Sequence, residues 1–307
     1  MGTPELSVIV CTCNRPETLE PTLASLTLQA RRSFEVVVVD QSSDERSREI
    51  VERLSAVDDR FRYLRLETRG LSRAYNTGIA ATRAPLVAFT DDDCIAPEDW
   101  LEEIEKAFSA NPSVQLLYGQ VLVALDVEAR GMTQGVIPAW PIPKRRVLDH
   151  RHFTVAGMGA NFAARRSLFN TVGHFDEVLG GGGPLESSQD FDFIYRVFRR
   201  GHATLLEPDV KVYHYGYREW TAWHSTLRSY GIGVGGFYTK HARLGDLYAA
   251  ALLFKALGRS ALRALRHLVM PRRWGAGDVA FVGGLLTGMR GSFRFGIDHS
   301  SRLYRTG

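Results

Sequence analysis

Short apolar segments alternate with helix-forming segments through the first third of this chain. Valine, isoleucine and other β-branched or aromatic residues dominate the apolar segments, and such residues favour strands. A strand that is apolar at nearly every position is buried on both faces, as in a parallel sheet covered by helices. We therefore expect an α/β fold with a mostly parallel sheet and flanking helices. The expected strands are residues 6–11, 34–39, 61–66 and 86–89.

Three consecutive aspartates, Asp91, Asp92 and Asp93, follow the fourth of these strands. Adjacent carboxylates repel one another, and a hard divalent cation such as Mg²⁺ or Mn²⁺ offsets that repulsion. In an open α/β sheet, ligands bind outside the carboxyl ends of the strands, where these acids are expected to lie. The run taken alone also fits a solvated acidic loop that caps the next helix. Its setting in the chain favours a metal site.

The ends of the first two strands carry further polar residues. Thr12 and Asn14 follow the first strand and Asp40 ends the second, so we expect all three at the same sheet edge as Asp91. A carboxylate there can accept a hydrogen bond from a nucleotide base or ribose, although Asp40 also fits a helix start. The turn after the first strand lacks GxGxxG, and the chain has no GxxxxGKS or GxxxxGKT loop. These absences argue against a dehydrogenase and a P-loop NTPase.

Cysteine content and hydropathy bound the location of the protein. The three cysteines form no CxxC pair and have no zinc-ligand spacing, so we expect reduced thiols in the cytoplasm. We expect no signal peptide, because the N-terminus lacks a basic segment followed by a long apolar one. No apolar stretch reaches the ~18 residues needed to span a membrane.

Positive charge is concentrated in the last part of the chain. Residues 240–307 contain 12 Lys or Arg and 3 Asp, giving +9; the whole chain carries +4, so residues 1–239 carry 4 − 9 = −5. A helix is predicted over 247–270, with an apolar face and a basic stripe. The basic stripe is Lys255, Arg259, Arg263 and Arg266, and the apolar face is Leu253, Leu257, Ala261, Ala264 and Leu268.

This basic segment, residues 247–307, has two interpretations. In the first, the segment binds an anionic membrane surface, which would place the protein peripherally on the inner face of the cell membrane. Alternatively, its apolar face packs on the catalytic domain or on a twin subunit, which leaves a homodimer possible. Nucleic acid is not an expected partner, because aromatic and basic residues do not interleave along the catalytic half.

Several segments resemble, in order, those of glycosyltransferase family 2 proteins of the GT-A fold. The strings are VIVCTCNRP, VVVVDQSSD, GLSRAYNTGIAAT, LVAFTDDDC, GMGANFAARRSLFNTVGHFDE, SSQDFDFIYRVFRRG and VYHYG. The resemblance covers about residues 5–216. It implies a GT-A, Rossmann-like sheet and transfer of a sugar from a nucleotide diphosphate sugar with inversion at the anomeric carbon.

The resemblance assigns roles residue by residue. Asp91 and Asp93 match the two acids of the DxD motif as metal ligands, with Asp93 the principal one. Asp92, between them, contacts either the ribose or the metal, and His214 matches a position that often completes the metal shell. The other donor-nucleotide positions are Thr12 and Asn14 in the first loop, Asp40 at the base, Arg73 near the diphosphate and Asn76 beside it.

The catalytic base is also assigned by resemblance. A carboxylate must take the proton from the attacking hydroxyl, and Asp190 matches the family's base. The chain departs from the family at Gln189, where Glu is usual, and at Tyr75, where Arg commonly precedes the Asn. The glycine run at 180–184 predicts a mobile loop.

These observations predict a metal-dependent inverting glycosyltransferase using Mn²⁺ or Mg²⁺. The expected donor is a UDP-, dTDP- or GDP-sugar, and the expected acceptor is a hydroxyl of a glycan or lipid-linked molecule in polysaccharide biosynthesis. The alternatives are a sugar nucleotidyltransferase and a non-catalytic nucleotide-sugar or glycan-binding module. The expected divisions are 1–110 for donor binding, 111–217 for acceptor binding and 218–307 for a basic amphipathic helical extension.

Overall fold

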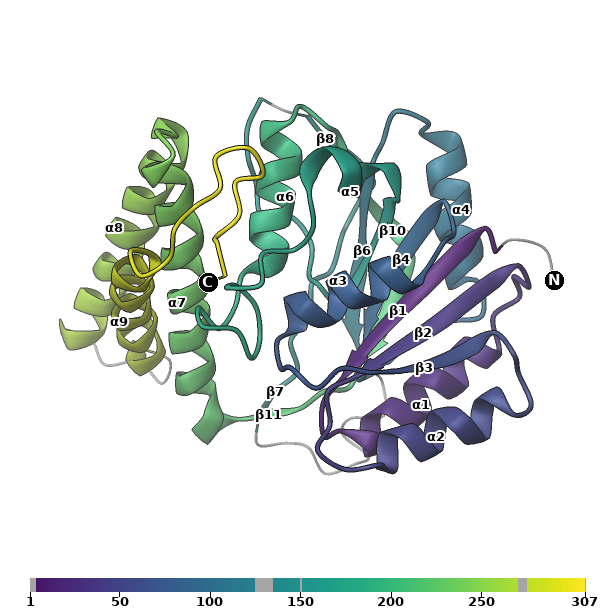
Figure 1. The fold of residues 1–307 in the computed structure, drawn as a ribbon. Coiled ribbons are helices and arrows are strands. Elements are labelled where there is room, and N and C mark those ends of the chain that lie inside the picture. The colour runs from purple at the N-terminus through teal and green to yellow at the C-terminus, as the bar shows by residue number, and fades with distance from the viewer. Residues whose placement is uncertain (1–3, 125–134, 150, 270–274, 307) are drawn as a thin grey trace.

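A mixed sheet with helices on both faces and a separate group of helices beside it make up the protein (Figure 1). The computed structural model describes residues 4–124, 135–149, 151–269 and 275–306. The sheet has nine strands in the order β3-β2-β1-β4-β9-β6-β10-β5, with β8 paired to β10. A small second sheet joins β7 (Gly135–Val136) and β11 (Arg218–Glu219).

The first half of the sheet is parallel, as the apolar runs predict. Its strands are β1 (Leu6–Thr12), β2 (Phe34–Asp40), β3 (Phe61–Arg65) and β4 (Leu86–Asp91). The register pairs Thr12 with Asp40 and Cys11 with Asp91. The polar residues that end these strands therefore meet at one edge of the sheet, as expected for a parallel arrangement.

The second half of the sheet mixes directions. The strand β9 (Asn161–Arg165) runs antiparallel to both β4 and β6 (Leu116–Val123), whereas β10 (Thr204–His214) is parallel to β6. The short strands β5 (Cys94–Ile95) and β8 (Arg146–Leu148) pair antiparallel with the two ends of β10. Because β5 follows the aspartate run directly, this pairing brings the end of β10 to Asp93.

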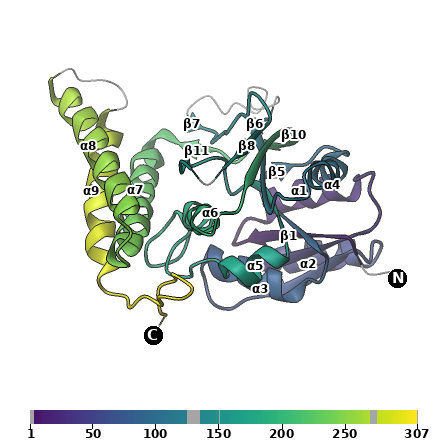
Figure 2. The same ribbon diagram turned by 90° about the horizontal axis from the view of Figure 1, so that it is seen from above.

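Two apolar cores cover the two faces of the sheet, which explains why the strands are apolar throughout. One core contains side chains of α1 (Pro16–Thr27), α2 (Arg46–Ser55) and α4 (Trp100–Ala110). The other contains side chains of α3 (Leu71–Ala81), α5 (Ser167–Val172) and α6 (Gln189–Arg199). Figure 2 shows these two helix layers on opposite sides of the strands.

Three helices form the C-terminal group: α7 (Trp220–Arg243), α8 (Leu247–Val269) and α9 (Gly275–Ser292). The sequence predicted a helical extension over 218–307 but gave α7 no helix of its own, because its glycines weaken helix propensity. The structure shows why these glycines are needed: a Cβ on Gly231 would lie 2.3 Å from the Phe281 carbonyl oxygen, and one on Gly235 2.2 Å from that of Leu285. Glycine therefore permits the close approach of α7 and α9.

The helix α8 has two different apolar faces. Leu253 is buried, and Leu257, Ala261 and Ala264 are partly buried, so the apolar face predicted from the sequence packs within the protein. The side chain of Leu268 lies outside the described residues. A second stripe remains exposed on the same helix: Leu247, Phe254, Leu262 and Leu265. Among the helices of the described residues, none combines the length and hydropathy needed to cross a bilayer.

The segment 180–184, predicted from its glycines to be a mobile loop, is hydrogen-bonded to the start of α3 in the structure; its mobility stays a prediction. The amide of Leu71 donates to the Gly181 carbonyl at 2.8 Å, and the Ser72 hydroxyl donates to that of Leu179, also at 2.8 Å. These bonds satisfy donors at the start of α3, where helix amides lack internal partners. The domain divisions at residues 110 and 217 stay predictions.

Candidate active site

The edge formed by the ends of β1, β2 and β4 holds most of the predicted polar residues. The hydroxyl of Thr12 donates to Oδ2 of Asp92 at 2.7 Å, and both residues are buried. Asp40, fully buried, accepts bonds from the Ser42 amide at 2.8 Å and from the Tyr63 hydroxyl at 2.9 Å. Each of its oxygens keeps a second lone pair for another donor.

Asn14 links the first two loops of this edge. It adopts a positive φ of 56°, a conformation that Asn tolerates better than most residues. Its side-chain oxygen accepts a hydrogen bond from the backbone amide of Ser43 at 2.8 Å, and its backbone amide donates one to the Ser42 hydroxyl at 2.7 Å. Asn14 thus fixes the loop after β1 against the loop after β2, beside Asp40.

Asp93 and His214 form the centre of the site. Nε2 of His214 lies 3.2 Å from Oδ1 of Asp93, and both side chains are almost completely buried. Within the described residues, Oδ1 of Asp93 and Nδ1 of His214 have no hydrogen-bond partner. Buried polar atoms without partners are costly, so this pair is suited to an additional ligand.

Gly216, two residues after His214, is needed at this position for steric reasons. A Cβ there would lie 1.9 Å from Oδ2 of Asp93 and 3.0 Å from Cε1 of His214. The amide of the intervening Tyr215 donates to the Asp93 carbonyl oxygen at 3.0 Å. The sequence string VYHYG includes Gly216, but only the fold shows that this glycine lies against Asp93.

The sequence analysis did not identify Arg15 as a site residue. Its guanidinium group bridges the aspartates, with Nη1 2.7 Å from Oδ1 of Asp92 and Nη2 in contact with Oδ2 of Asp93. The side chain comes from the loop between β1 and α1, where its direction is not encoded by any spacing. A cation is therefore held at the carboxylates by a side chain of the protein itself.

Burial and neighbouring charges shift the pKa values of the carboxylates in opposite directions. Burial and the negative charge of Asp93 raise the pKa of Asp91 to about 7. Burial alone would also raise the pKa of Asp93, but His214 and Arg15 outweigh it and hold that pKa below its usual range. A buried site that concentrates negative charge next to an imidazole fits a divalent metal.

Cys94 is the third potential ligand atom near Asp93 and His214. Burial, with the charges of Asp91 and Asp93, raises the pKa of the Cys94 thiol well above its usual value. Since the thiolate is the metal-binding form, Cys94 is a poor ligand here. The oxygen-rich remainder favours Mg²⁺ or Mn²⁺ over a thiophilic metal.

Asp190 lies at the first turn of α6, close to the residue that precedes β9 by two positions. Its Oδ2 is 3.4 Å from the position that a Cβ on Gly159 would occupy, and Gly159 shortly precedes Asn161, which pairs with Thr90 on β4. Although Asp190 is only half-buried as a residue, burial of its carboxyl group raises the pKa to about 6, partly offset by backbone amides. One of these is the Phe191 amide, 2.9 Å from Oδ1.

Buried charges anchor the helix that carries Asp190. The ammonium group of Lys240, on α7, lies 2.6 Å from Asp176 and 2.6 Å from Asp192, and all three side chains are fully buried. Burial alone would raise the pKa of Asp192, but Lys240 and Arg196 hold it far below its usual range. The amide of Tyr304 donates to the same Asp176 carboxylate at 2.9 Å. The network joins α6, α7 and the segment after α9.

Two predicted donor contacts, Arg73 and Asn76, lie on α3 and contact the segment before the glycine run. Nε of Arg73 is 3.3 Å from Oε2 of Glu177. The amide group of Asn76 donates to the Phe175 carbonyl at 3.0 Å and accepts from the Phe175 amide at 2.9 Å. Asn76 thus has a structural role in addition to the predicted donor contact.

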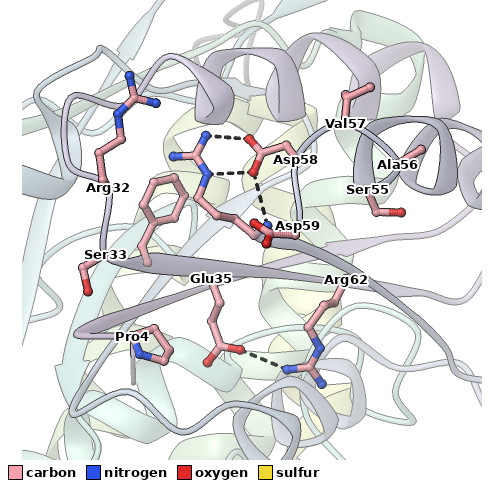
Figure 3. Close-up of a pocket in the computed structure, with 12 residues that line it drawn as sticks. Pro4, Arg32, Ser33, Glu35, Ser55, Ala56, Val57, Asp58, Asp59 and Arg62 are labelled. Atoms are coloured by element: carbon pink, nitrogen blue, oxygen red, sulfur yellow. Dashed lines mark hydrogen bonds and ion pairs between the residues drawn. The ribbon is translucent and has the colours of Figure 1, made fainter. Parts of the chain in front are cut away.

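A cavity of the described residues lies away from this edge. It has a volume of about 1020 Å³ and is lined by residues around the starts of β2 and β3, at the opposite end of these strands from Asp40 (Figure 3). Four of its charged side chains are paired: Arg60 with Asp58 at 2.5 Å and Arg62 with Glu35 at 3.0 Å. Ligands of open α/β sheets bind at the carboxyl ends of the strands, so the aspartate edge remains the candidate site.

Comparisons with known proteins agree with the fold. A glucosyl-dolichyl phosphate glucuronosyltransferase of Haloferax volcanii is 24% identical over 75% of this chain and 77% of its own. A Campylobacter jejuni GalNAc(5)-diNAcBac-PP-undecaprenol beta-1,3-glucosyltransferase is 26% identical over 66% and 68%. The mannosyltransferase PcManGT of Pyrobaculum calidifontis, solved with GDP-Man and Mn²⁺, shares the fold with a TM-score of 0.62 at 18% identity, covering 94% of this chain and 88% of its own. Residues 7–173, more than half of the chain, match the glycosyl transferase family 2 model, so the protein belongs to that family and is a glycosyltransferase.

Proposed function

We propose that this glycosyltransferase is metal-dependent and inverting, and that it transfers a sugar from a nucleotide diphosphate sugar to a hydroxyl of a lipid-linked or glycan acceptor. The observation that carries the proposal is the buried Asp93–His214 pair at the strand edge. The proposed metal, and Asp190 as base, then lie on the two sides of one reaction centre.

Asp93, with Asp91 and His214, would hold the metal. When bound, Mn²⁺ or Mg²⁺ supplies positive charge that neutralises the leaving diphosphate. Groups of the protein itself orient the carboxylates for the metal. Thr12 does this for Asp92, and the Tyr215 amide does it at the backbone of Asp93, whereas the Arg15 guanidinium would compete with the metal for these carboxylates.

The donor nucleotide is proposed to lie across the ends of β1 and β2. Asp40 would contact the base, with Thr12 and Asn14 shaping the loop, and Asp92 would contact the ribose or the metal. On α3, Arg73 would lie near the diphosphate, with Asn76 beside it. A neighbour in fold was solved with GDP-Man and Mn²⁺, which supports a nucleotide diphosphate donor without fixing its base for this chain.

Asp190 is the proposed base. Its carboxylate accepts the proton of the acceptor hydroxyl as that oxygen forms a bond to the anomeric carbon. The bond from this carbon to the diphosphate oxygen breaks at the same time, and the nucleoside diphosphate leaves with the electron pair. A pKa of about 6 leaves most of Asp190 ionised at neutral pH, yet basic enough to accept the proton.

The acceptor is proposed to be lipid-linked, and the C-terminal helices to lie on an anionic membrane surface at the inner face of the cell membrane. Names of two relatives contain dolichyl phosphate and PP-undecaprenol. On α8, the exposed stripe of Leu247, Phe254, Leu262 and Leu265 runs beside exposed basic residues. Apolar burial and attraction to anionic lipid then act together, each basic residue contributing up to about 1 kcal/mol.

The sequence left two other functions open, and the family assignment decides against both. Relatives of this chain are named glycosyltransferases, which does not fit a sugar nucleotidyltransferase or a non-catalytic binding module. A homodimer and the absence of nucleic-acid binding stay predictions.

The test is Asp190→Asn. This variant keeps the size and the amide contacts of the side chain but cannot accept the proton. We expect nucleotide-sugar binding with Mn²⁺, measured by thermal shift across UDP-, dTDP- and GDP-sugars, to match the unmodified protein, while transfer falls roughly 10²- to 10⁴-fold. Full transfer by Asp190→Asn, or no stabilisation by any nucleotide sugar, would overturn the proposal.

A further inference from the structure

Three arginines line a pocket between the C-terminal helices and the segment that leads into α6. The pocket has a volume of about 400 Å³. Arg228 comes from α7, Arg290 from α9 and Arg294 from the turn after α9, while the segment 184–186 forms the facing wall. The chain therefore gathers three positive charges from distant parts of the sequence at one place.

These arginines have no partner that neutralises them. Within the described residues, none of the three forms an ion pair or a hydrogen bond through its side chain. Glu186 is the one acid in the pocket wall, and its Oε2 accepts a bond from the Ser229 hydroxyl at 2.5 Å. Like charges held together repel, so the pocket is stabilised by an anion, and the guanidinium fork matches phosphate oxygens.

Two exposed apolar side chains come from the same part of the chain as the pocket arginines. Leu286 is 52% exposed and lies on α9 four residues before Arg290, so the two share one helix face. Phe293 is 68% exposed and lies in the turn directly after α9, beside Arg294, with the Arg243 guanidinium 4.9 Å from its ring centroid. A ligand that fits this surface has a phosphate for the arginines and a hydrocarbon chain for Leu286 and Phe293.

The pocket is close to the proposed base but distinct from it. Glu186 precedes Asp190 by four residues, so their Cα atoms are within about 14 Å of each other. The Ser187 hydroxyl donates to the Ser229 carbonyl at 2.9 Å, which fixes this segment to α7. A phosphate in the pocket therefore lies at a fixed, short distance from the place where the acceptor hydroxyl reacts.

We propose that the pocket of Arg228, Arg290 and Arg294 binds the phosphate of a lipid-linked acceptor, with the start of its hydrocarbon chain on Leu286 and Phe293. The phosphate anchors the acceptor but does not react; the reacting hydroxyl belongs to a sugar that lies between the phosphate and Asp190. The inference rests on the proposed function, whose acceptor it specifies.

The test uses the full chain and geranyl phosphate as a soluble probe, without vesicles. The pocket variant is Arg290→Gln with Arg294→Gln, and the matched control is Arg32→Gln with Arg83→Gln, which removes the same charge from exposed positions outside the C-terminal helices. We expect the pocket variant to lose at least roughly tenfold in geranyl phosphate affinity, as is typical when charged hydrogen bonds are removed. The control should keep the affinity of the unmodified protein.

Three results would overturn the inference. They are equal losses in both variants, which indicate general charge attraction; pyrophosphate binding as tight as geranyl phosphate, which indicates a site for free phosphate; and no binding of geranyl phosphate. Donor binding is measured on the same samples by thermal shift with a nucleotide sugar and Mn²⁺. If neither the unmodified protein nor either variant binds the nucleotide sugar, the proposed function is refuted. If all three bind the nucleotide sugar but none binds geranyl phosphate, only the proposed pocket is refuted.

Discussion

Replacing Gly216 with alanine tests whether the Asp93–His214 pair is built as the structure shows. The new Cβ would lie 1.9 Å from Oδ2 and 2.6 Å from Cγ of Asp93. Real Cβ atoms essentially never approach closer than 3.0 Å, so the carboxylate or the strand end must move by about 1.1 Å (from 1.9 to 3.0 Å). Asp93 is almost fully buried and contacts His214 and Arg15, so any movement of its carboxylate disturbs both contacts.

The expected consequence is a loss of metal affinity. Metal ligands must be held closely, and disturbing the groups that orient them typically costs 10- to 100-fold in affinity. We expect Gly216→Ala to weaken Mn²⁺ binding in the presence of nucleotide by that roughly 10- to 100-fold factor, measured by electron paramagnetic resonance of free Mn²⁺. Transfer at limiting Mn²⁺ should fall by a similar factor and recover partly at high Mn²⁺.

A matched glycine provides the control. Gly258, in α8, has nothing within 4 Å of the position of a Cβ, so Gly258→Ala adds a methyl group without a clash. Alanine in an exposed helix stabilises by roughly 0.5–1 kcal/mol relative to glycine. Mn²⁺ affinity should be unchanged in Gly258→Ala. Unchanged affinity in Gly216→Ala as well would refute the geometry that places Asp93 against this glycine.

Three more changes probe the same region. Lowering the pH below about 6 protonates Asp190, so transfer at saturating donor should fall about tenfold per pH unit there; a flat profile down to pH 5 would remove Asp190 as the base. Arg15→Ala removes a cation from the carboxylates and should increase Mn²⁺ affinity in the absence of nucleotide, measured by calorimetry, whereas a decrease would show that Arg15 supports metal binding. Lys240→Met leaves two buried carboxylates without their shared cation and should lower the free energy of unfolding in urea by about 3–5 kcal/mol. The same change at exposed Lys255 should alter it by less than about 0.5 kcal/mol.

The sequence predicted the parallel half of the sheet well, because burial on both faces makes each strand apolar throughout. Thr12, Asp40 and Asp91 were identified for the same reason, since each ends or follows such a strand. The antiparallel strand β9 is not among the strands that the sequence predicts. Its small residues, Ala163 and Ala164, pack in the core but give no periodic pattern.

Other features depend on contacts between distant segments, which no local pattern contains. Arg15 contacts the aspartates only because its loop lies across the sheet edge. The helix α7 carries glycines that argue against a helix until α9 packs on them. On α8, the sequence contains two apolar stripes, and either could be buried. The position of the neighbouring helices determines that Leu253 is buried and Phe254 is exposed.

The buried charges around Lys240 have a consequence for how the protein forms during synthesis. The strands that hold the aspartates pair among residues made early, so that part of the sheet can assemble while the ribosome is still translating. The helix bearing Asp190 depends on Lys240, and Asp176 also takes a bond from the Tyr304 amide. A nascent chain that stops short of residue 304 therefore holds a complete donor edge and an unfinished support for its base. The ability to bind a nucleotide sugar should appear before the ability to transfer it.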